Sequence, residues 1–246
     1  MTVDEATLVH EVAVAAVVVG LHVADHVVVP RVLHVPGHVL ATAGLLGAGH
    51  ALGLDAHALG LSRAHLGRGI RHGGFHGAAI IASLGTAAAV PALRPMFLDD
   101  GVAAASRREL FWRALVAIPV GTAVYEEVLF RGVLLGLADR RWGASTSTVA
   151  TSLAFGAWHI LPTIADHESR PSAASVPLAV EVAGTVAATA VAGLAFTRLR
   201  RRSGSLLAPI LVHAVVNVAT LAVSVLVSRA GGGGEPPHPD GVPATP

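Results

Sequence analysis

The stretch Glu126-Glu127-Val128-Leu129-Phe130-Arg131-Gly132 decides how this sequence folds, because it places three ionisable side chains inside an otherwise apolar segment. That segment runs from Leu110 to Leu137 and exceeds the roughly 20 residues that a helix needs to cross a hydrocarbon core. An ionised side chain at the centre of a spanning helix costs roughly 2.5 to 3.5 kcal/mol on insertion scales. The stretch therefore predicts a membrane helix whose charged residues are kept for a function.

Within this helix, Glu127 and Arg131 are four residues apart and share one face, so we expect them to form an ion pair. Glu126 lies about 100° away around the helix and points elsewhere. One carboxylate is then structural and the other is free for chemistry. The alternative is a buried ion pair next to a glutamate without a role, but two adjacent acids at such depth are hard to explain by packing alone.

Two further polar signatures lie in later apolar segments. Phe155 and His159 are one helical turn apart, so the ring is expected to line the wall that fixes the imidazole. Taken alone, His159 is more simply a histidine hydrogen-bonded to a neighbouring helix, and Phe155 is plain packing. His213 and Asn217 share one face of the last apolar segment, after Pro209, where they can bind a metal, hold a water or donate to an oxyanion. Polar contacts between helices are the alternative for this pair.

Composition places the whole chain in a membrane. Of its 246 residues 53% are hydrophobic and only 13% are charged, with a mean hydropathy of +0.64, against roughly 25% charged residues in a soluble domain. The formal net charge of +1 gives no clustered basic face for nucleic acid. The sequence therefore predicts a membrane protein that contacts lipid and has no nucleic-acid partner.

The chain contains no cysteine, which excludes disulfides, thiolate nucleophiles and thiolate metal sites. All 17 residues in the Lys+Arg total are arginines, so lysine-based dyads and Schiff bases are excluded as well. Glutamate, aspartate, histidine, asparagine and hydroxyl groups remain as candidates for chemistry.

The apolar segments predict an all-α fold, a polytopic transmembrane bundle of about seven to eight helices. We expect one membrane-embedded domain over residues 1–230, with a catalytic half at about 110–227, and a disordered Gly/Pro-rich tail at 231–246. The expected spans are Ala6 to Val29, Val35 to Leu54, Gly74 to Leu93, Leu110 to Leu137, Thr146 to Ala165, Ala174 to Thr197 and Leu206 to Val227.

Arginine placement predicts the orientation of the bundle, because short cytoplasmic loops carry the excess of positive charge. The loop with Arg63, Arg68 and Arg71, the pair Arg140-Arg141 and the run from Arg198 to Arg202 are expected on the cytoplasmic side. Arg94, Arg107 and Arg108 disagree with this scheme unless residues 95–113 fold back along a membrane surface.

In chain order, Glu126-Glu127-x-x-x-Arg131, Phe155-x-x-x-His159 and His213-x-x-x-Asn217 resemble the motifs of the CAAX protease and bacteriocin-processing family, also called the CPBP or Abi intramembrane proteases. The resemblance covers roughly residues 110–227. It implies an intramembrane endopeptidase in which Glu126 activates water with assistance from His159. His213 and Asn217 would stabilise the oxyanion or hold a metal, with Glu127, Arg131 and Phe155 in supporting positions.

Metal dependence is open at the level of the sequence. Glu126, His159 and His213 supply the ligand number of a catalytic zinc site, so a zinc metalloprotease is one hypothesis. The His-Glu-x-x-His helix of zincins is missing, however, and the resemblance is equally compatible with a mechanism that needs no metal.

The resemblance leaves the substrate undefined: a membrane-proximal peptide or a lipid-anchored protein are the candidates. An Arg- and Ala-rich chain without an organellar signal is typical of a bacterial protein, so we expect a multi-pass protein of the cell membrane with a site open toward the cytoplasm. The alternatives are a catalytically silent scaffold or immunity protein, which would be expected to have lost a signature, and an ion or proton transporter, which would be expected to show inverted repeats.

Other polar residues in apolar stretches are given no catalytic part. His22, Asp25 and His26 have ligand spacing but are interpreted as surface polarity, and His38 as a solvated or interfacial residue. Glu181 lies within an expected span and is predicted to pair with an arginine or to line a groove.

Overall fold

The computed structural model describes residues 14–169 and 176–231, and all the regular elements in these ranges are helices. This confirms the all-α class. The predicted tail and the first part of the first span lie outside the described residues. The main helices are an N-terminal helix at Val14–Val28, α2 at His34–Ala51, α3 at Leu66–Ala89, α7 at Leu135–Ala157, α8 at Ile160–Ser169, α9 at Leu178–Ser203 and α10 at Leu207–Gly231.

The helix that carries the two adjacent glutamates is widened on both sides of them. It runs without a break through α5 (Arg107–Trp112), a π-helical stretch at Arg113–Val124, the short α6 (Tyr125–Glu127) and a second π-helical stretch at Val128–Leu134 into α7. Because π-helical turns inside α-helices are frequently found at functional sites, this geometry makes α6 a candidate position for such a site. The helix ends at Gly143, whose positive φ of 74° turns the chain back within the residues assigned to α7.

Two of the described helices, α9 and α10, are long and apolar enough to cross a membrane. The helices at residues 63–89 and Pro91–Phe97 meet at a bend of 112°. Taken together as one broken span, they are a third segment long and apolar enough to cross a membrane. The predicted span from Thr146 to Ala165 is not one helix, because α7 ends at Ala157 and α8 begins at Ile160. The other predicted spans form helices, but their membrane crossing stays a prediction.

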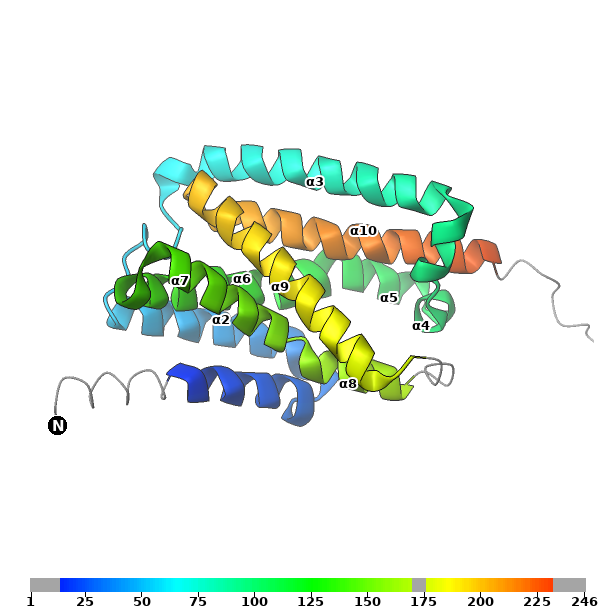
Figure 1. The fold of residues 1–246 in the computed structure, drawn as a ribbon, viewed down its shortest axis with the longest axis horizontal. Coiled ribbons are helices and arrows are strands. Elements are labelled where there is room, and N and C mark those ends of the chain that lie inside the picture. Colours follow the sequence, from blue (N-terminus) through cyan, green and yellow to red (C-terminus); the bar gives the residue numbers. More distant parts are fainter. Residues whose placement is uncertain (1–13, 170–175, 232–246) are drawn as a thin grey trace, which may run out of the picture.

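Close packing between helices depends on small residues. In Figure 1, α3 and α10 run side by side, while α9 runs diagonally across the bundle and packs along α7. Gly73 of α3 lies so close to α10 that an added Cβ would come within 2.8 Å of Leu211, and at Gly156 of α7 it would lie 2.7 Å from the Val186 carbonyl of α9. Pro209 does not kink α10, because it stands in the first turn, where a proline fits.

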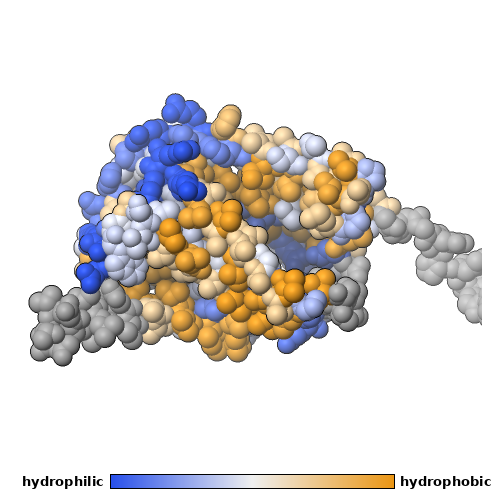
Figure 2. All heavy atoms as spheres, viewed as in Figure 1, coloured by the Kyte–Doolittle hydropathy of each residue, from blue (hydrophilic) through white to orange (hydrophobic). Residues whose placement is uncertain are grey.

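The loops that carry most of the arginines gather at one end of the bundle. Arg140 donates to the carbonyls of Leu52 and Gly53, while Arg201 at the end of α9 binds Asp139. Figure 2 shows hydrophilic residues concentrated at this end and apolar residues over most of the remaining surface. The clustering agrees with the predicted grouping of these loops, and which side of a membrane they face stays a prediction.

The segment with the discordant arginines lies against the other end of α10. It is broken into Pro91–Phe97, α4 (Asp100–Ala104) and α5. Arg229 of α10 donates to the Ala105 carbonyl, and the Asp99 backbone N–H donates to Ser228. Arg107 and Arg108, the first residues of α5, therefore lie at the opposite end of the bundle from the other arginine loops.

Candidate active site

The predicted ion pair on the widened helix is present. Nη1 of Arg131 donates to Oε1 of Glu127 at 2.9 Å, and neither side chain is exposed. Their spacing of one turn places both on the face that packs into the bundle. The predicted ion pair between Glu127 and Arg131 is therefore confirmed.

Aromatic rings enclose the Arg131 guanidinium. Its Cζ lies 4.0 Å from the ring centroid of Phe155 and 5.2 Å from that of Phe196, at distances where a cation is attracted to the face of a ring. Nε and Nη2 of Arg131 and Oε2 of Glu127 are buried without a hydrogen-bond partner among the described residues. The positive charge of Arg131 is thus stabilised mainly by one hydrogen bond to Glu127 and by the faces of the surrounding rings.

His213 joins this pair from α10. Its Nδ1 donates to Oε1 of Glu127 at 2.9 Å, so the same oxygen accepts from both Arg131 and His213. The imidazole is buried and stacks on Phe196, with centroids 5.2 Å apart and an interplanar angle of 24°. Glu127 thereby fixes the orientation of the His213 ring, and Nε2 points away from it.

The second glutamate lies on the other side of this ring. Oε2 of Glu126 is 3.9 Å from Nε2 of His213, and it is buried without a hydrogen-bond partner among the described residues. Two polar atoms at this separation are too far apart for a direct hydrogen bond but can share one water molecule. Of the two glutamates, Glu126 is therefore the one whose carboxylate does not form a direct ion pair with Arg131 or a hydrogen bond with His213.

His159 stands at the break between α7 and α8, not in the middle of a continuous span. Its Nδ1 donates to the Phe155 carbonyl at 2.8 Å, which leaves Nε2 with a free lone pair in the neutral ring. The Phe155 ring packs edge-on against both His159, at 4.9 Å, and His213, at 6.0 Å. The expectation that Phe155 fixes the imidazole is confirmed, but His159 makes no direct contact with Glu126 or His213.

Asn217 follows His213 by one turn of α10 and is half-buried. Its side chain makes no hydrogen bond to another residue within the described parts of the chain. The structure thus brings Glu126, Glu127, Arg131, Phe155 and His213 into one cluster, which His159 and Asn217 flank.

Sequence reasoning missed Phe196, which contacts both Arg131 and His213 from α9. Its only signal was an isolated aromatic residue among small ones. Sequence reasoning also missed a second cluster beside Tyr125. His38 of α2 stacks on the Tyr125 ring at 4.3 Å and donates to the Gly121 carbonyl, and its Nε2 lies 2.5 Å from Asp25.

The interpretation of the N-terminal histidines as surface groups is wrong. Asp25 and His38 have only 12% and 14% of their side chains exposed, and the His22 ring lies 4.8 Å from that of Trp158. These residues are held inward because the N-terminal helix and α2 cover the face of the widened helix next to Glu126. Glu181 contacts Nδ1 of His167 at 2.7 Å, and its predicted pairing with an arginine stays a prediction.

The donor atoms do not fit the zinc hypothesis. Within residues 14–169 and 176–231, no three histidine, aspartate or glutamate side chains come together as metal ligands. Glu126, His159 and His213 therefore do not form such a group. We therefore derive no step through a metal.

Comparison with known proteins agrees with the motifs. Residues 108–219 match a family model described as type II CAAX prenyl endopeptidase Rce1-like, and this range contains all three signatures. The resemblance to the CAAX protease family is thereby confirmed over residues 108–219, and that family is a family of proteases. No curated protein and no solved structure matches the chain.

Proposed function

We propose that this protein, whose residues 108–219 match a CAAX protease family, is an intramembrane endopeptidase that uses Glu126 to activate water. The observation that carries the proposal is the placement of His213 between two buried carboxylates. One of them, Glu127, orients the ring through Nδ1, and the other, Glu126, faces Nε2 across 3.9 Å. If the cluster served only to stabilise the fold, we would expect the second carboxylate to have a hydrogen-bond partner as well.

Charge balance supports a proton shared between Glu126 and His213. The buried cluster contains two carboxylates and one guanidinium, so it is neutral only when one further proton is bound. Burial disfavours an uncompensated charge strongly. With that proton on His213, Glu126 is an ionised base and Nε2 of His213 is a hydrogen-bond donor, which are the two states that peptide hydrolysis requires.

The chemical step follows from this arrangement. Glu126 takes a proton from a water molecule while the water oxygen attacks the peptide carbonyl carbon, and the carbonyl oxygen becomes an oxyanion. His213 and Asn217 donate to that oxyanion. The C–N bond then breaks as the leaving nitrogen receives the proton that Glu126 had taken, which restores the carboxylate and completes the balance of atoms.

The remaining site residues act through position. Glu127 and Arg131 hold the His213 ring, and Phe155 fixes both His159 and the guanidinium. His159 presents a free Nε2 toward the break between α7 and α8, where it assists by accepting a hydrogen bond from water or substrate. This division keeps the roles that the family resemblance implies.

The proposed substrate is a membrane-proximal peptide or a lipid-anchored protein. The supporting observations are the protease family and the two helices long and apolar enough to cross a membrane. We place the protein in the cell membrane with several spans and with the arginine-rich end on the cytoplasmic side, as the positive-inside rule predicts.

The test compares membranes that contain the wild type, Glu126→Gln or Glu109→Gln. Glu109 is a matched control because it lies on the same long helix with 52% of its side chain exposed. Peptides released from membrane proteins should appear with the wild type and with Glu109→Gln, and should disappear with Glu126→Gln. Thermal unfolding should be similar for all three, since Oε2 of Glu126 makes no hydrogen bond to another described residue.

An unchanged peptide set for Glu126→Gln would overturn the peptidase assignment. If the variant also kept the biological effect of the wild type, a scaffold without catalysis would replace it.

A further inference from the structure

A cationic pocket lies away from the candidate active site, at the arginine-rich end of the bundle. The cavity has a volume of about 530 Å³, and it opens between the loop before α3, the end of the widened helix and the last turn of α9. Its lining residues are His57, Ala58, His65, Arg68, Asp139, Arg200, Arg201, Arg202 and Gly204. Four arginines and two histidines thus surround a single carboxylate.

Arg200 forms the floor of this pocket as a buried cation without a carboxylate partner. Only 8% of the residue is exposed, and its Nη2 donates to the carbonyls of His57 and Ala58 at 3.1 and 2.9 Å. Its Nε is buried without a partner among the described residues. Neutral carbonyls leave the charge uncompensated, and a buried charge in that state is costly unless an anion binds it.

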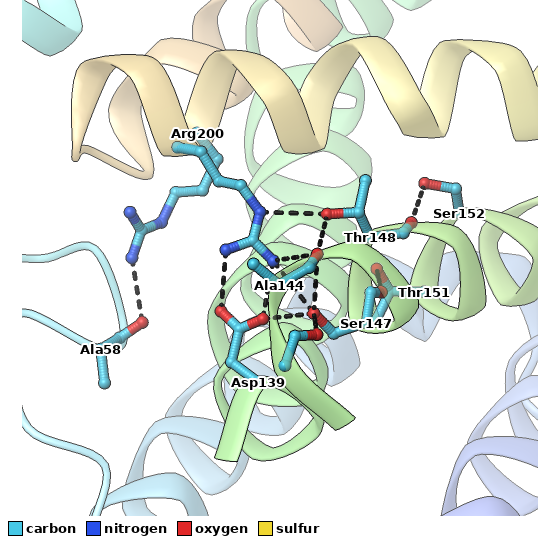
Figure 3. Close-up of polar contacts among 10 residues, drawn as sticks. Ala58, Asp139, Ala144, Ser147, Thr148, Thr151, Ser152 and Arg200 are labelled. Atoms are coloured by element: carbon cyan, nitrogen blue, oxygen red, sulfur yellow. Dashed lines mark hydrogen bonds and ion pairs between the residues drawn. The ribbon is translucent and has the colours of Figure 1, made fainter. Parts of the chain in front are cut away.

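The one carboxylate among the lining residues, Asp139, is already paired with another arginine. Arg201 donates to both oxygens of Asp139, at 2.6 and 3.0 Å, and Ser147 hydrogen-bonds to the same side chain. Figure 3 shows Asp139 facing this second guanidinium while Arg200 points to the other side, toward Ala58. Asp139 therefore neutralises Arg201 and leaves the charge of Arg200 unmatched.

The shape of the floor is fixed by the backbone. Gly60 has a φ of 75°, and an added Cβ there would lie 2.3 Å from Nε of Arg200. Nδ1 of His65 donates to the Gly204 carbonyl at 3.0 Å, which ties the loop to the end of α9. Asp55 lies in the same loop but does not line the pocket. Its carboxylate accepts a hydrogen bond from the Ala58 backbone N–H, which lowers the pKa of Asp55.

Two arginines at the rim of the pocket make no hydrogen bond to the described parts of the chain. Arg68 and Arg202 are both exposed and make no hydrogen bond to another residue in the described parts of the chain. They add two exposed cations to the buried one. A pocket with a fixed guanidinium below and two free ones above matches a tetrahedral oxyanion such as a phosphate.

The position of the pocket indicates where that phosphate comes from. It lies at the last turn of α9, one of the two helices able to cross a membrane, at the end of the bundle where hydrophilic residues gather in Figure 2. Phospholipid headgroups occupy this level, and basic pockets between membrane helices bind them. We infer that the pocket binds the phosphate of an anionic phospholipid through Arg200, Arg68 and Arg202.

The experiment uses the full chain in nanodiscs of phosphatidylcholine with increasing phosphatidylglycerol, and measures lipid retained on the protein by native mass spectrometry. Arg68→Gln/Arg202→Gln is compared with Arg107→Gln/Arg108→Gln, which removes the same charge from exposed positions at the other end. The first variant should lose phosphatidylglycerol binding about tenfold or more, and the second should keep it, because each arginine near a lipid phosphate contributes on the order of 1 kcal/mol.

Arg200→Met gives a second measurement. It should abolish selective lipid retention, and the rise in unfolding temperature that phosphatidylglycerol gives to the wild type should vanish. Equal losses of phosphatidylglycerol binding in both double variants would show that binding depends on general surface charge, and would overturn the proposal of a specific pocket. Binding of inorganic phosphate without a preference for phosphatidylglycerol would assign a soluble anion and overturn the lipid as the ligand.

Discussion

Replacing Arg131 by leucine should destabilise the protein strongly, and the structure gives the size of the effect. The substitution removes a guanidinium that donates to Glu127 at 2.9 Å with neither side chain exposed. Breaking a buried pair by removing one partner costs about 3–5 kcal/mol, because the other charge stays buried without compensation. The loss of the Phe155 contact at 4.0 Å adds to this cost.

The double variant Glu127→Gln/Arg131→Leu should recover most of that loss. Glutamine keeps an oxygen that accepts from Nδ1 of His213, while no uncompensated charge remains at the pair. Three atoms of the wild-type pair also lack partners among the described residues, so the pair is far from fully satisfied. We expect the double variant within about 1–2 kcal/mol of the wild type, so that adding Glu127→Gln recovers about 1–4 kcal/mol of the loss caused by Arg131→Leu.

The assay is reversible unfolding of the detergent-solubilised full chain in a denaturing detergent, followed by tryptophan fluorescence, for the wild type, both single variants and the double variant. Trp158 is 3% exposed and lies in the same aromatic cluster as Phe155, so it reports directly on the site. A loss below about 1 kcal/mol for Arg131→Leu, or a double variant as unstable as the sum of the singles, would refute the reasoning.

Two further substitutions test the packing away from the site. Gly73→Ala should destabilise by about 1–3 kcal/mol, because its Cβ would lie under 3 Å from Leu211, whereas Gly74→Ala has nothing within 4 Å and should be neutral or slightly stabilising in the same unfolding assay. Arg201→Lys should cost about 1–2 kcal/mol, because lysine cannot reproduce the two hydrogen bonds to Asp139, and the exposed Arg198→Lys should change stability by less than about 0.5 kcal/mol.

The local part of the site could be predicted from the sequence because it depends on helix periodicity alone. Glu127 and Arg131 pair within one turn, and Glu126 faces elsewhere, as their spacing requires. The same rule placed Phe155 against His159. Interactions of this kind need no knowledge of the tertiary fold, since the partners are carried by one helix.

Contacts between distant residues could not be predicted in the same way. The hydrogen bond from His213 to Glu127 joins positions 86 residues apart, and only the packing of α10 on the widened helix creates it. The π-helical stretches around α6 also escape a pattern analysis that assumes 3.6 residues per turn. Gly69, Gly73 and Gly77 lie four residues apart on α3, and an added Cβ at these positions would meet Ser205, Leu211 and Val215.

The N-terminal helices complete the site although they lie outside the range that matches the family. Val35 and His38 of α2 pack on Gly121, where a Cβ would lie 3.1 Å from Val35, and His38 covers Tyr125, the residue before the proposed base. Both ring nitrogens of His38 face oxygen acceptors, so this ring is held in one orientation by Gly121 and Asp25. The wall beside Glu126 is therefore set by residues that the family motifs do not contain, and a chain limited to residues 108–219 would leave the Gly121 carbonyl and the Tyr125 ring uncovered.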